Sequence, residues 1–551
     1  MSSKKDQRPL PMVLNEKDLL QIDEAFIRRL REHNPDALAG LSIKLANDLK
    51  EAMERLNQNP SNSSKPSGSL APWDKGGTDD GDAPEDLPDE DPDETASDAS
   101  PDAEAPSDEA LKSAAFSDTK DPHQRARKPG RQVGSPGFGR TQKLTITDRE
   151  HHHCAPCCVC NTDLSEIEKA YTGFYSVNLT FGDATSAGVQ LTHTHHLYYA
   201  ATCPACGLEN RSQPNRAAED TLDWEQVGLT EWRLIGPDLA ALIVYLSMDM
   251  RLTRRQVKRF LFDLFGLHLS VGSLQNCLVE SARALSPVEA QLAEDLLSDS
   301  LIHADETSHP EAINRLWLWV FITSTTALFL IGARSKEVFN NLLDAVTPRY
   351  TGWIMSDGYG VYRDYTRRLR CWAHLIRKAK GLKDSYHAPT REYGQRVWDI
   401  LNHLMAAVYQ AREGPNQGTL SLSAAHQATL ESLRQVCESM ADCSHPKTRA
   451  LGREFLNDWE AIFRVLEYPA WPLTNNEAER ALRHWVILRK ITQGTRSPQG
   501  SRALALFASV ITTCRLRGHS PLLFMRDVIK LRRQGFEAPR IPDAITPLEA
   551  I

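Results

Sequence analysis

The chain has 551 residues, of which 41% are apolar and 25% are charged, and its net charge is −8. That length provides for three or four domains. The first ten residues lack the apolar segment of a secretion signal, and the longest nearly apolar run, residues 239–248, is about half the length of a membrane span. We therefore expect a soluble protein of the cytoplasm, with no membrane partner.

Residues 1–58 are expected to be a helical segment. Over residues 36–56, Leu and Ala side chains recur every three or four positions, which predicts one apolar stripe along a helix. The stripe is shorter than three heptads, and coiled coils of that length are marginal alone. Two interpretations of this stripe therefore stay open, an ordinary amphipathic helix and a self-association zipper.

Residues 59–150 are predicted to be a disordered linker, first acidic and then basic. Its acidic tract, residues 78–109, holds fifteen Asp and Glu and no Lys or Arg, and without these charges the net charge of −8 becomes +7. Ser, Asn, Pro and Gly flank the tract, so the segment cannot bury a core. The mildly basic remainder permits a polyanionic partner but does not by itself demonstrate one.

Residues 151–214 are predicted to form a zinc-binding module. Cys157 and Cys160 are separated by two residues, as are Cys203 and Cys206. Two thiolate pairs at that spacing give the closed four-cysteine coordination of a structural Zn²⁺ ion, and strand-like alternation between the pairs is typical of a zinc ribbon. Buried thiols without a metal are the alternative. The ligand set also stays open, because further candidates lie nearby: Cys154, Cys158, His193, His195 and His196.

Residues 215–296 are predicted to be a helical DNA-binding region of the helix-turn-helix kind. One helix is expected to begin after Thr253 and end at Gly266, and a second to begin at Ser270. Such a turn leaves the second helix available to a major groove of DNA. The same layout occurs in many α-helical domains, so a packing role is the alternative. The side chains suited to phosphates are Arg254, Arg255, Lys258 and Arg259, and those suited to base edges are Ser273, Gln275 and Asn276.

Residues 297–383 are predicted to be the first part of a mixed α/β domain. Short runs rich in Trp, Ile, Val and Phe predict strands, and the longest run is long enough for a hairpin. The strands are expected at 301–305, twice within 316–331, and at 353–355, with a helix at 336–346. Helical periodicity alone fills residues 384–470, and helices are again expected over residues 471–551.

Three acidic residues lie at the end of a predicted strand or the start of a predicted helix. Asp305 ends one strand, Asp357 follows another, and Glu479 begins a helix. A buried carboxylate is costly unless it meets a cation or a donor, and three that converge would offer the oxygen ligands that Mg²⁺ and Mn²⁺ prefer. Taken singly, Asp305 could cap a helix, Asp357 could belong to a turn, and Glu479 could pair with Arg483.

Several motifs, taken in order, resemble those of the insertion-sequence-66 family of bacterial DDE transposases. They cover most of the chain and are NSSKPS at 62–67, the two cysteine pairs, HADET at 303–307, SDGYGVY at 356–362, CWAHLIRK at 371–378 and NNEAERALR at 475–483. The resemblance implies an RNase H-like catalytic core with residues 384–470 as a helical insertion. It also implies that Asp305, Asp357 and Glu479 are catalytic and hold two Mg²⁺ or Mn²⁺ ions.

The family's final glutamate directly precedes an arginine, which matches Glu479 and leaves Glu477 as a fallback. The implied reaction is cleavage of double-stranded DNA at the ends of an insertion sequence, followed by transfer of the freed 3′ ends to target DNA. His374 could contact substrate or orient a catalytic group, although a packed structural histidine is the alternative. The basic residues expected near the scissile phosphate, or else on a solvated helix face, are Arg480, Arg483, Arg489 and Lys490.

A reaction that joins two DNA ends requires a homo-oligomer, and the resemblance also implies accessory proteins encoded beside this one. Two other classes of function stay open. One is a domesticated, non-catalytic DNA-binding regulator that keeps the zinc module and the helix-turn-helix. The other is an RNase H-fold nuclease that cleaves without strand transfer and shares every catalytic residue.

Overall fold

The computed structural model describes residues 24–56, 144–182, 188–216, 228–345 and 349–545. The N-terminal part contains α2 (Glu24–His33) and α3 (Pro35–Leu56), and α3 confirms the helix predicted over 36–56. The acidic tract and the NSSKPS motif lie outside the described residues. Among the described helices, none is long and apolar enough to cross a membrane.

The cysteine-rich region forms a small sheet of four strands in which β3 is central. Strand β3 pairs antiparallel with β2 along nearly its whole length, parallel with β1 on its other side, and antiparallel with the short β4. The strands are β1 (Asp148–His152), β2 (Lys169–Phe181), β3 (Val189–Thr202) and β4 (Glu209–Arg211). The predicted alternation is present, but β1 includes the last residues of the segment expected to be a disordered linker.

Three helices follow this sheet, and local capping residues set both ends of α5 and the start of α6. Thr253 and Gln256 form a reciprocal capping box at the start of α5, and Gly266 ends that helix in the left-handed conformation with φ 62°. The Ser270 side chain accepts from the backbone of Ser273 at the start of α6. The helices are α4 (Pro237–Met248), α5 (Arg254–Phe265) and α6 (Val271–Leu297). Both predicted helices of the pair are present, and α6 continues through Pro287 to Leu297, one residue past the predicted region.

The central sheet is mixed and has the strand order β7-β6-β5-β8-β9. Strands β5, β6 and β7 are antiparallel neighbours, whereas β8 and β9 extend the sheet parallel to β5. The elements are β5 (Leu301–Glu311), β6 (Asn314–Ile322), β7 (Ala327–Gly332), α7 (Lys336–Leu343), β8 (Trp353–Ser356) and β9 (Arg368–Arg370). The predicted hairpin, the helix and the strand at 353–355 are confirmed, while β9 was not predicted. The prediction that a strand ends at Asp305 was wrong, because β5 stays paired with β6 as far as Glu311 and Asp305 lies inside it.

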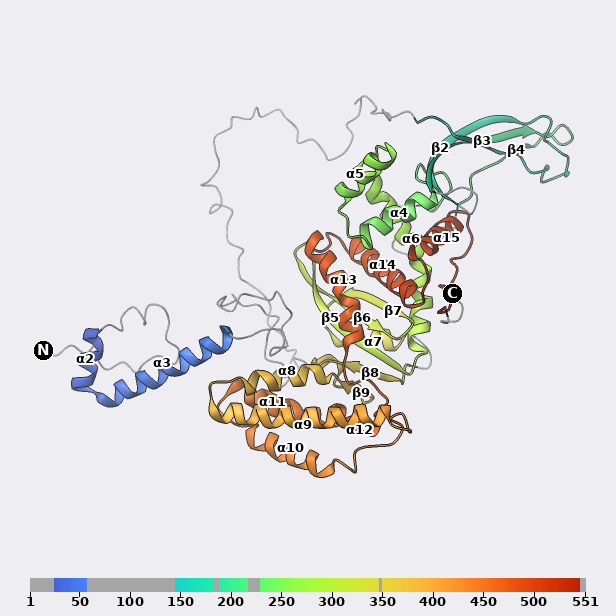
Figure 1. Cartoon of the computed structure of the whole chain (residues 1–551). Helices are drawn as coiled ribbons and strands as arrows, with labels where there is room; N and C mark the ends of the chain where they lie inside the picture. The colour runs from blue at the N-terminus through green and yellow to red at the C-terminus, as the bar shows by residue number, and fades with distance from the viewer. Residues whose placement is uncertain (1–23, 57–143, 183–187, 217–227, 346–348, 546–551) are drawn as a thin grey trace, which may run out of the picture.

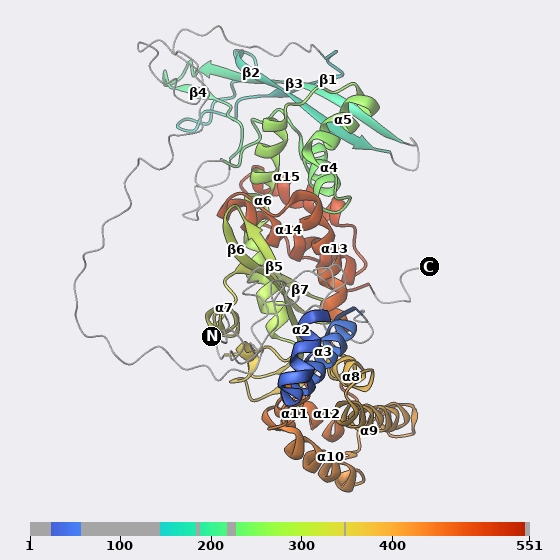
Figure 2. The same ribbon diagram turned by 90° about the vertical axis from the view of Figure 1, so that its left-hand side faces the viewer.

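Helices α8–α12 form a separate apolar core beyond β8 and β9, at the end of the structure opposite the small sheet (Figures 1 and 2). Their bounds are α8 (Trp372–Lys383), α9 (Ala388–Glu413), α10 (Gln427–Met440), α11 (Pro446–Asn457) and α12 (Trp459–Glu467). Buried ion pairs join this core to β9, because Arg370 contacts both Glu454 and Asp458, and Arg368 contacts Asp458 as well. Removing one partner of such a buried pair leaves an uncompensated charge.

The last helices are α13 (Asn476–Thr492), α14 (Pro498–Leu516) and α15 (Pro521–Arg533) (Figure 1). Helices α13 and α14 pack on the central sheet, whereas α15 packs on α4, α6 and α14. Helix α14 lies along the edge strand β7. The Ala327 and Phe329 amides donate to the hydroxyl groups of Thr513 and Ser509 at 3.0 and 2.8 Å. These contacts cover a sheet edge that would otherwise expose unpaired backbone groups.

Candidate active site and metal centres

Asp305 and Asp357 lie on neighbouring parallel strands of the central sheet. The pairing of β5 with β8 matches Leu301 with Trp353 and His303 with Met355, and the same register continued by two residues aligns Asp305 with Asp357. Asp357 follows the last residue of β8, and its Oδ1 accepts from the Tyr359 amide at 2.9 Å, which fixes the turn. The structure therefore brings together the two aspartates that the sequence placed at strand ends.

Helix α13 carries Glu479 to the same place because its N-terminus is attached to β5. The fully buried Asn475 donates from Nδ2 to the Ala304 carbonyl at 2.7 Å, and its Oδ1 lies 3.1 Å from Nδ1 of His303. Its own amide donates to Sγ of Cys371, the residue before α8, at 3.2 Å. Glu479 follows one helical turn later and donates its amide to the Asn475 carbonyl.

The three carboxylates interact electrostatically, and Asp305 is the most strongly affected. Burial raises the pKa of Asp305 well above its usual value, and the charges of Glu306, Asp357 and Glu479 raise it further. Together, however, they do not form one of the groups of described side chains whose ligand atoms all lie within 4.8 Å of one another. Three like-charged carboxylates repel one another and are expected to lie apart, whereas a bound divalent cation would draw them together.

Glu306 was missed by the sequence analysis, although it lies in the HADET motif beside Asp305. Its carboxylate accepts from Tyr362 Oη at 2.8 Å and from Arg334 Nη2 at 3.0 Å. Burial, followed by the charge of Asp357, raises the pKa of Glu306 to about 7. The Tyr362 and Arg334 contacts hold this buried carboxylate in place one residue from Asp305.

His374 and Glu479 face each other between α8 and α13. Nε2 of His374 lies 3.8 Å from Glu479 Oε1, and the Arg377 guanidinium is 3.4 Å from the same oxygen. Burial lowers the pKa of His374, so the imidazole is neutral near pH 7. With Cys371, these two side chains form one of the groups whose ligand atoms lie within 4.8 Å. The predicted accessory histidine is thus adjacent to the predicted glutamate.

The basic residues predicted near this site on α13 fall into two groups. Arg483 and Lys490 are exposed, and the exposed Arg480 lies 3.6 Å from Glu477 Oε1. Arg489 instead points back to β5, where it donates to the Ser308 carbonyl and to Thr307 Oγ1. Arg489 therefore has a structural contact that the sequence did not indicate.

The basic residues predicted on α5 form an exposed group on that helix: Arg254, Arg255, Lys258 and Arg259. Arg259 lies 3.1 Å from Asp263, one turn further along α5. Among the residues predicted to contact base edges, Asn276 is exposed, Gln275 is half-buried, and Ser273 hydrogen-bonds Ser270 in the α6 cap.

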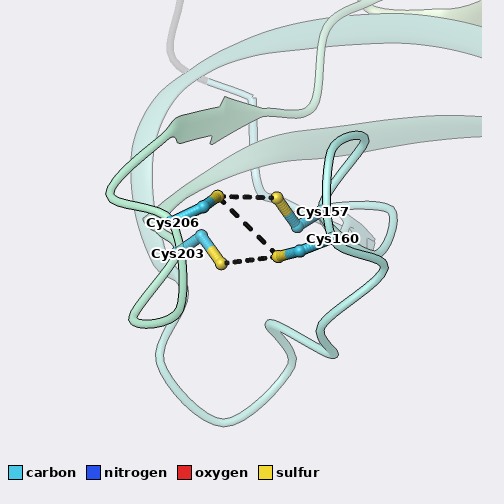
Figure 3. Close-up of side chains that lie close together, drawn as sticks. All are labelled: Cys157, Cys160, Cys203 and Cys206. Carbon is cyan, nitrogen blue, oxygen red and sulfur yellow. Dashed lines mark hydrogen bonds between the residues drawn. The ribbon is translucent and has the colours of Figure 1, made fainter.

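Four cysteines converge at one end of the small sheet (Figure 3). The Sγ atoms of Cys157 and Cys206 are 3.5 Å apart, those of Cys160 and Cys203 are 3.4 Å apart, and those of Cys160 and Cys206 are 3.7 Å apart. Four thiolates at about 2.3 Å from a tetrahedral zinc ion lie roughly 3.8 Å from one another, so the donor set fits Zn²⁺.

The other candidate zinc ligands are placed differently. Cys158 is exposed, and Sγ of Cys154 donates to the Tyr199 carbonyl at 3.1 Å and does not belong to the group of four converging thiols. Amides of Cys160 and Val159 lower the pKa of Cys157 to about 6, which favours the thiolate that a metal requires. The predicted set of Cys157, Cys160, Cys203 and Cys206 is therefore the one that the structure brings together.

Comparison with known proteins adds independent information. Residues 233–503 match the model of a protein family described as "Transposase IS66 family". The match begins before α4, contains the whole central sheet and α8–α13, and ends within α14. All three candidate carboxylates lie inside it.

Three curated relatives come from Sinorhizobium fredii (strain NBRC 101917 / NGR234). Uncharacterized protein y4hP is 25% identical over 54% of this chain and 59% of its own length. Uncharacterized protein y4qI is 24% identical over 45% of this chain and 50% of its own length. Uncharacterized protein y4jO is 28% identical over 36% of this chain and 56% of its own length. The chain thus spans 50–59% of the length of these relatives.

Proposed function

Because residues 233–503 match the model of the IS66 transposase family, we propose that the chain is a DDE transposase that acts on the ends of an insertion sequence. It would cleave double-stranded DNA at those ends and transfer the freed 3′ ends to target DNA. The observation that carries the proposal is the convergence of Asp305, Asp357 and Glu479 from a strand, a strand end and a helix that Asn475 joins to the sheet.

The sheet topology supports an RNase H-like core. The first strand of the domain, β5, is central, with an antiparallel pair on one side and two parallel strands on the other. That order is the one expected of an RNase H-like sheet, and helices α8–α12 enter between Asp357 and Glu479 as the proposed insertion. In this arrangement Asp305 lies inside β5, two residues beyond its last pairing with β8, and Asp357 directly follows β8.

Asp305 and Asp357 would hold two Mg²⁺ or Mn²⁺ ions between them, and Glu479 would complete the second ion's oxygen ligands. Bound there, the ions supply activation of water or a 3′-hydroxyl and stabilisation of the leaving oxygen in an in-line phosphoryl transfer. Glu306 would keep the β5 backbone in place through Tyr362 and Arg334. His374, neutral and beside Glu479, would orient that carboxylate.

DNA contacts are proposed on two surfaces. On α13, Arg480, Arg483 and Lys490 project from the helix that carries Glu479, and Arg489 contributes positive charge close to β5. On α5, the four basic residues would contact phosphates while the start of α6 lies in a major groove, as in a helix-turn-helix. The four-cysteine group would hold a structural Zn²⁺ ion in the small sheet.

Synapsis of two DNA ends requires at least a dimer. Helix α3 offers a surface for self-association, because Ile43 and Leu49 are 63% and 62% exposed on an otherwise amphipathic helix. Accessory proteins encoded beside this chain are also proposed, and they belong in any test of activity.

The test is movement in cells of a marker bounded by the DNA that flanks the gene, with neighbouring reading frames supplied. Asp305→Asn, Asp357→Asn and Glu479→Gln remove a charge each with little change of shape, and each should abolish movement while end binding in a gel-shift assay persists. Glu477→Gln is the matched control, because Glu477 is exposed and lies on the same turn of α13. It should retain movement.

Two results would overturn the proposal. End cleavage that depends on the three carboxylates, without joining to target DNA, would identify a nuclease. Binding of the ends by every variant, with no movement by the wild-type chain, would identify a DNA-binding regulator.

A further inference from the structure

A second group of metal-ligating side chains lies in the small sheet, outside the four-cysteine group. Nδ1 of His196 is 3.1 Å from Nε2 of His152 and 3.3 Å from Oε2 of Glu150. Nε2 of His152 is 3.9 Å from the other oxygen of Glu150. The ligand atoms of all three residues lie within 4.8 Å of one another, and none of the three belongs to the cysteine group.

The sheet itself brings these side chains together. Strand β1 runs parallel to β3, and its register matches Glu150 directly with His196. His152 lies two residues further along β1, and residues two apart on a strand point to the same face. Backbone pairing therefore puts the three residues on one face of the sheet, within reach of one another.

Aromatic rings hold both imidazoles in place. The His196 ring stacks on Phe174 with centroids 4.5 Å apart, and the His152 ring stacks on Tyr198 at 4.3 Å. Trp232 covers Phe174 in turn, at 5.0 Å. The side chains of His196 and His152 are 15% and 26% exposed, so the site is shielded on the aromatic side and open on the side of Glu150.

His196 is also oriented as a metal ligand would be. Its second ring nitrogen, Nε2, lies 2.9 Å from Oγ of Ser176 on β2. A metal-bound histidine commonly donates its other N–H to such an acceptor, which fixes the ring and leaves the remaining nitrogen free for the ion.

The spacing of the three ligand atoms suits a tetrahedral ion. Nitrogen and oxygen ligands about 2.0–2.2 Å from Zn²⁺ lie roughly 3.3–3.6 Å from one another. The observed separations of 3.1, 3.3 and 3.9 Å bracket that range. Two histidines and one carboxylate form a donor set that Zn²⁺ accepts, with the fourth position left for water.

We propose that Glu150, His152 and His196 bind a second Zn²⁺ ion, separate from the four-cysteine site. The ion would join β1 to β3 through side chains, in addition to the backbone pairing of these strands. The proposal concerns this sheet alone and does not depend on the proposed enzymatic activity.

Zinc content of the purified full-length chain, without a histidine tag and after dialysis against metal-free buffer, tests the proposal. We expect about two zinc ions per chain for the wild type and about one for Glu150→Gln, His152→Ala and His196→Ala. His195→Ala is the matched control, because His195 neighbours His196 on the opposite face of β3 and stacks on Tyr175. The double variant His151→Ala/His153→Ala controls for the adjacent imidazoles. Both controls should keep about two ions.

Replacement of zinc by Co²⁺ separates loss of the site from loss of the fold. Cobalt at four cysteines gives thiolate-to-metal charge-transfer bands, whereas cobalt bound by nitrogen and oxygen does not. A variant that keeps those bands but binds one cobalt ion fewer has a folded module and lacks only the second site. The proposal is overturned if the wild type binds a single ion, or if the three ligand variants bind as much metal as the controls. In that case the three side chains form a hydrogen-bonded chain without an ion.

Discussion

The side chain of Asn475 donates a 2.7 Å hydrogen bond to the carbonyl of Ala304, the residue that precedes Asp305. This contact joins the first residue before α13 to the strand that carries the candidate aspartate, across 171 positions of the sequence. Since Glu479 lies one turn into α13, the distance between its carboxylate and Asp305 depends on this attachment. Asn475 therefore positions the site without contacting the reacting atoms.

Asn475→Ala should lower both stability and activity. The substitution leaves the Ala304 carbonyl and His303 without their partner in a fully buried location, at a cost of about 1–3 kcal/mol. Thermal unfolding and marker movement would measure the two effects. Asn476→Ala is the control, because Asn476 is exposed at the next position. Equal behaviour of the two variants would contradict the role assigned to Asn475.

Local signals in the sequence were sufficient to predict much of the fold. Thr253, Gly266 and Ser270 fix the ends of α5 and α6 through capping contacts within a few residues, so a pattern of residue types reveals them. The hairpin of β6 and β7 follows similarly from two apolar runs around a short turn.

Elements that depend on distant partners were not predictable in this way. Strand β9 has the sequence Arg-Leu-Arg, and its buried guanidinium groups are stabilised by Glu454 and Asp458, more than 80 residues away. The roles of Asn475 and Glu306 also arise from tertiary contacts. Asp357 and Glu479 were found because each has a local signature at an element end, and Asp305 because it follows an apolar run inside β5. The residues that position these carboxylates have no such signature.

Mg²⁺ should reverse the stability order of the wild type and Asp305→Asn. Without Mg²⁺, the variant should unfold at the same or a higher temperature, because it removes a buried charge that Glu306 and Asp357 repel. With Mg²⁺ at about 100 times its dissociation constant, binding stabilises the wild type by about 2.7 kcal/mol, and the variant gains much less. Calorimetry in zinc-replete buffer measures the unfolding temperatures of both proteins with and without Mg²⁺. An equal gain for the two proteins would show that Mg²⁺ binds elsewhere.

His309 should make the chain less stable in acid. Burial, with the nearby charge of Arg489, lowers the pKa of His309 to about 4, whereas an unfolded histidine titrates near about 6.5. Between these values the unfolded state binds more protons, so stability falls as the pH falls. His309→Gln keeps a polar contact for Thr495, which lies 3.2 Å away, and cannot titrate. The melting temperature of the wild type relative to this variant should therefore drop from pH 7 to pH 4.5, and a constant difference would refute the assignment.

Gly358→Ala should disrupt the site, although it adds a single methyl group. Gly358 follows Asp357, and a Cβ there would lie 2.4 Å from Nη2 of Arg370 and 3.1 Å from Oε1 of Glu454. Arg370 cannot move aside easily, because it is buried and held by Glu454 and Asp458. Overpacking of this kind costs about 1–3 kcal/mol, and the displaced turn would shift the Asp357 carboxylate away from Asp305.

We therefore expect Gly358→Ala to unfold at a lower temperature and to lose marker movement. Gly360→Ala is the matched control two residues along, since a Cβ at that position meets no atom within 4 Å. It should retain the wild-type melting temperature and movement. A Gly358→Ala protein that moves the marker as well as Gly360→Ala would show that the packing of Arg370 against the turn does not set the position of Asp357.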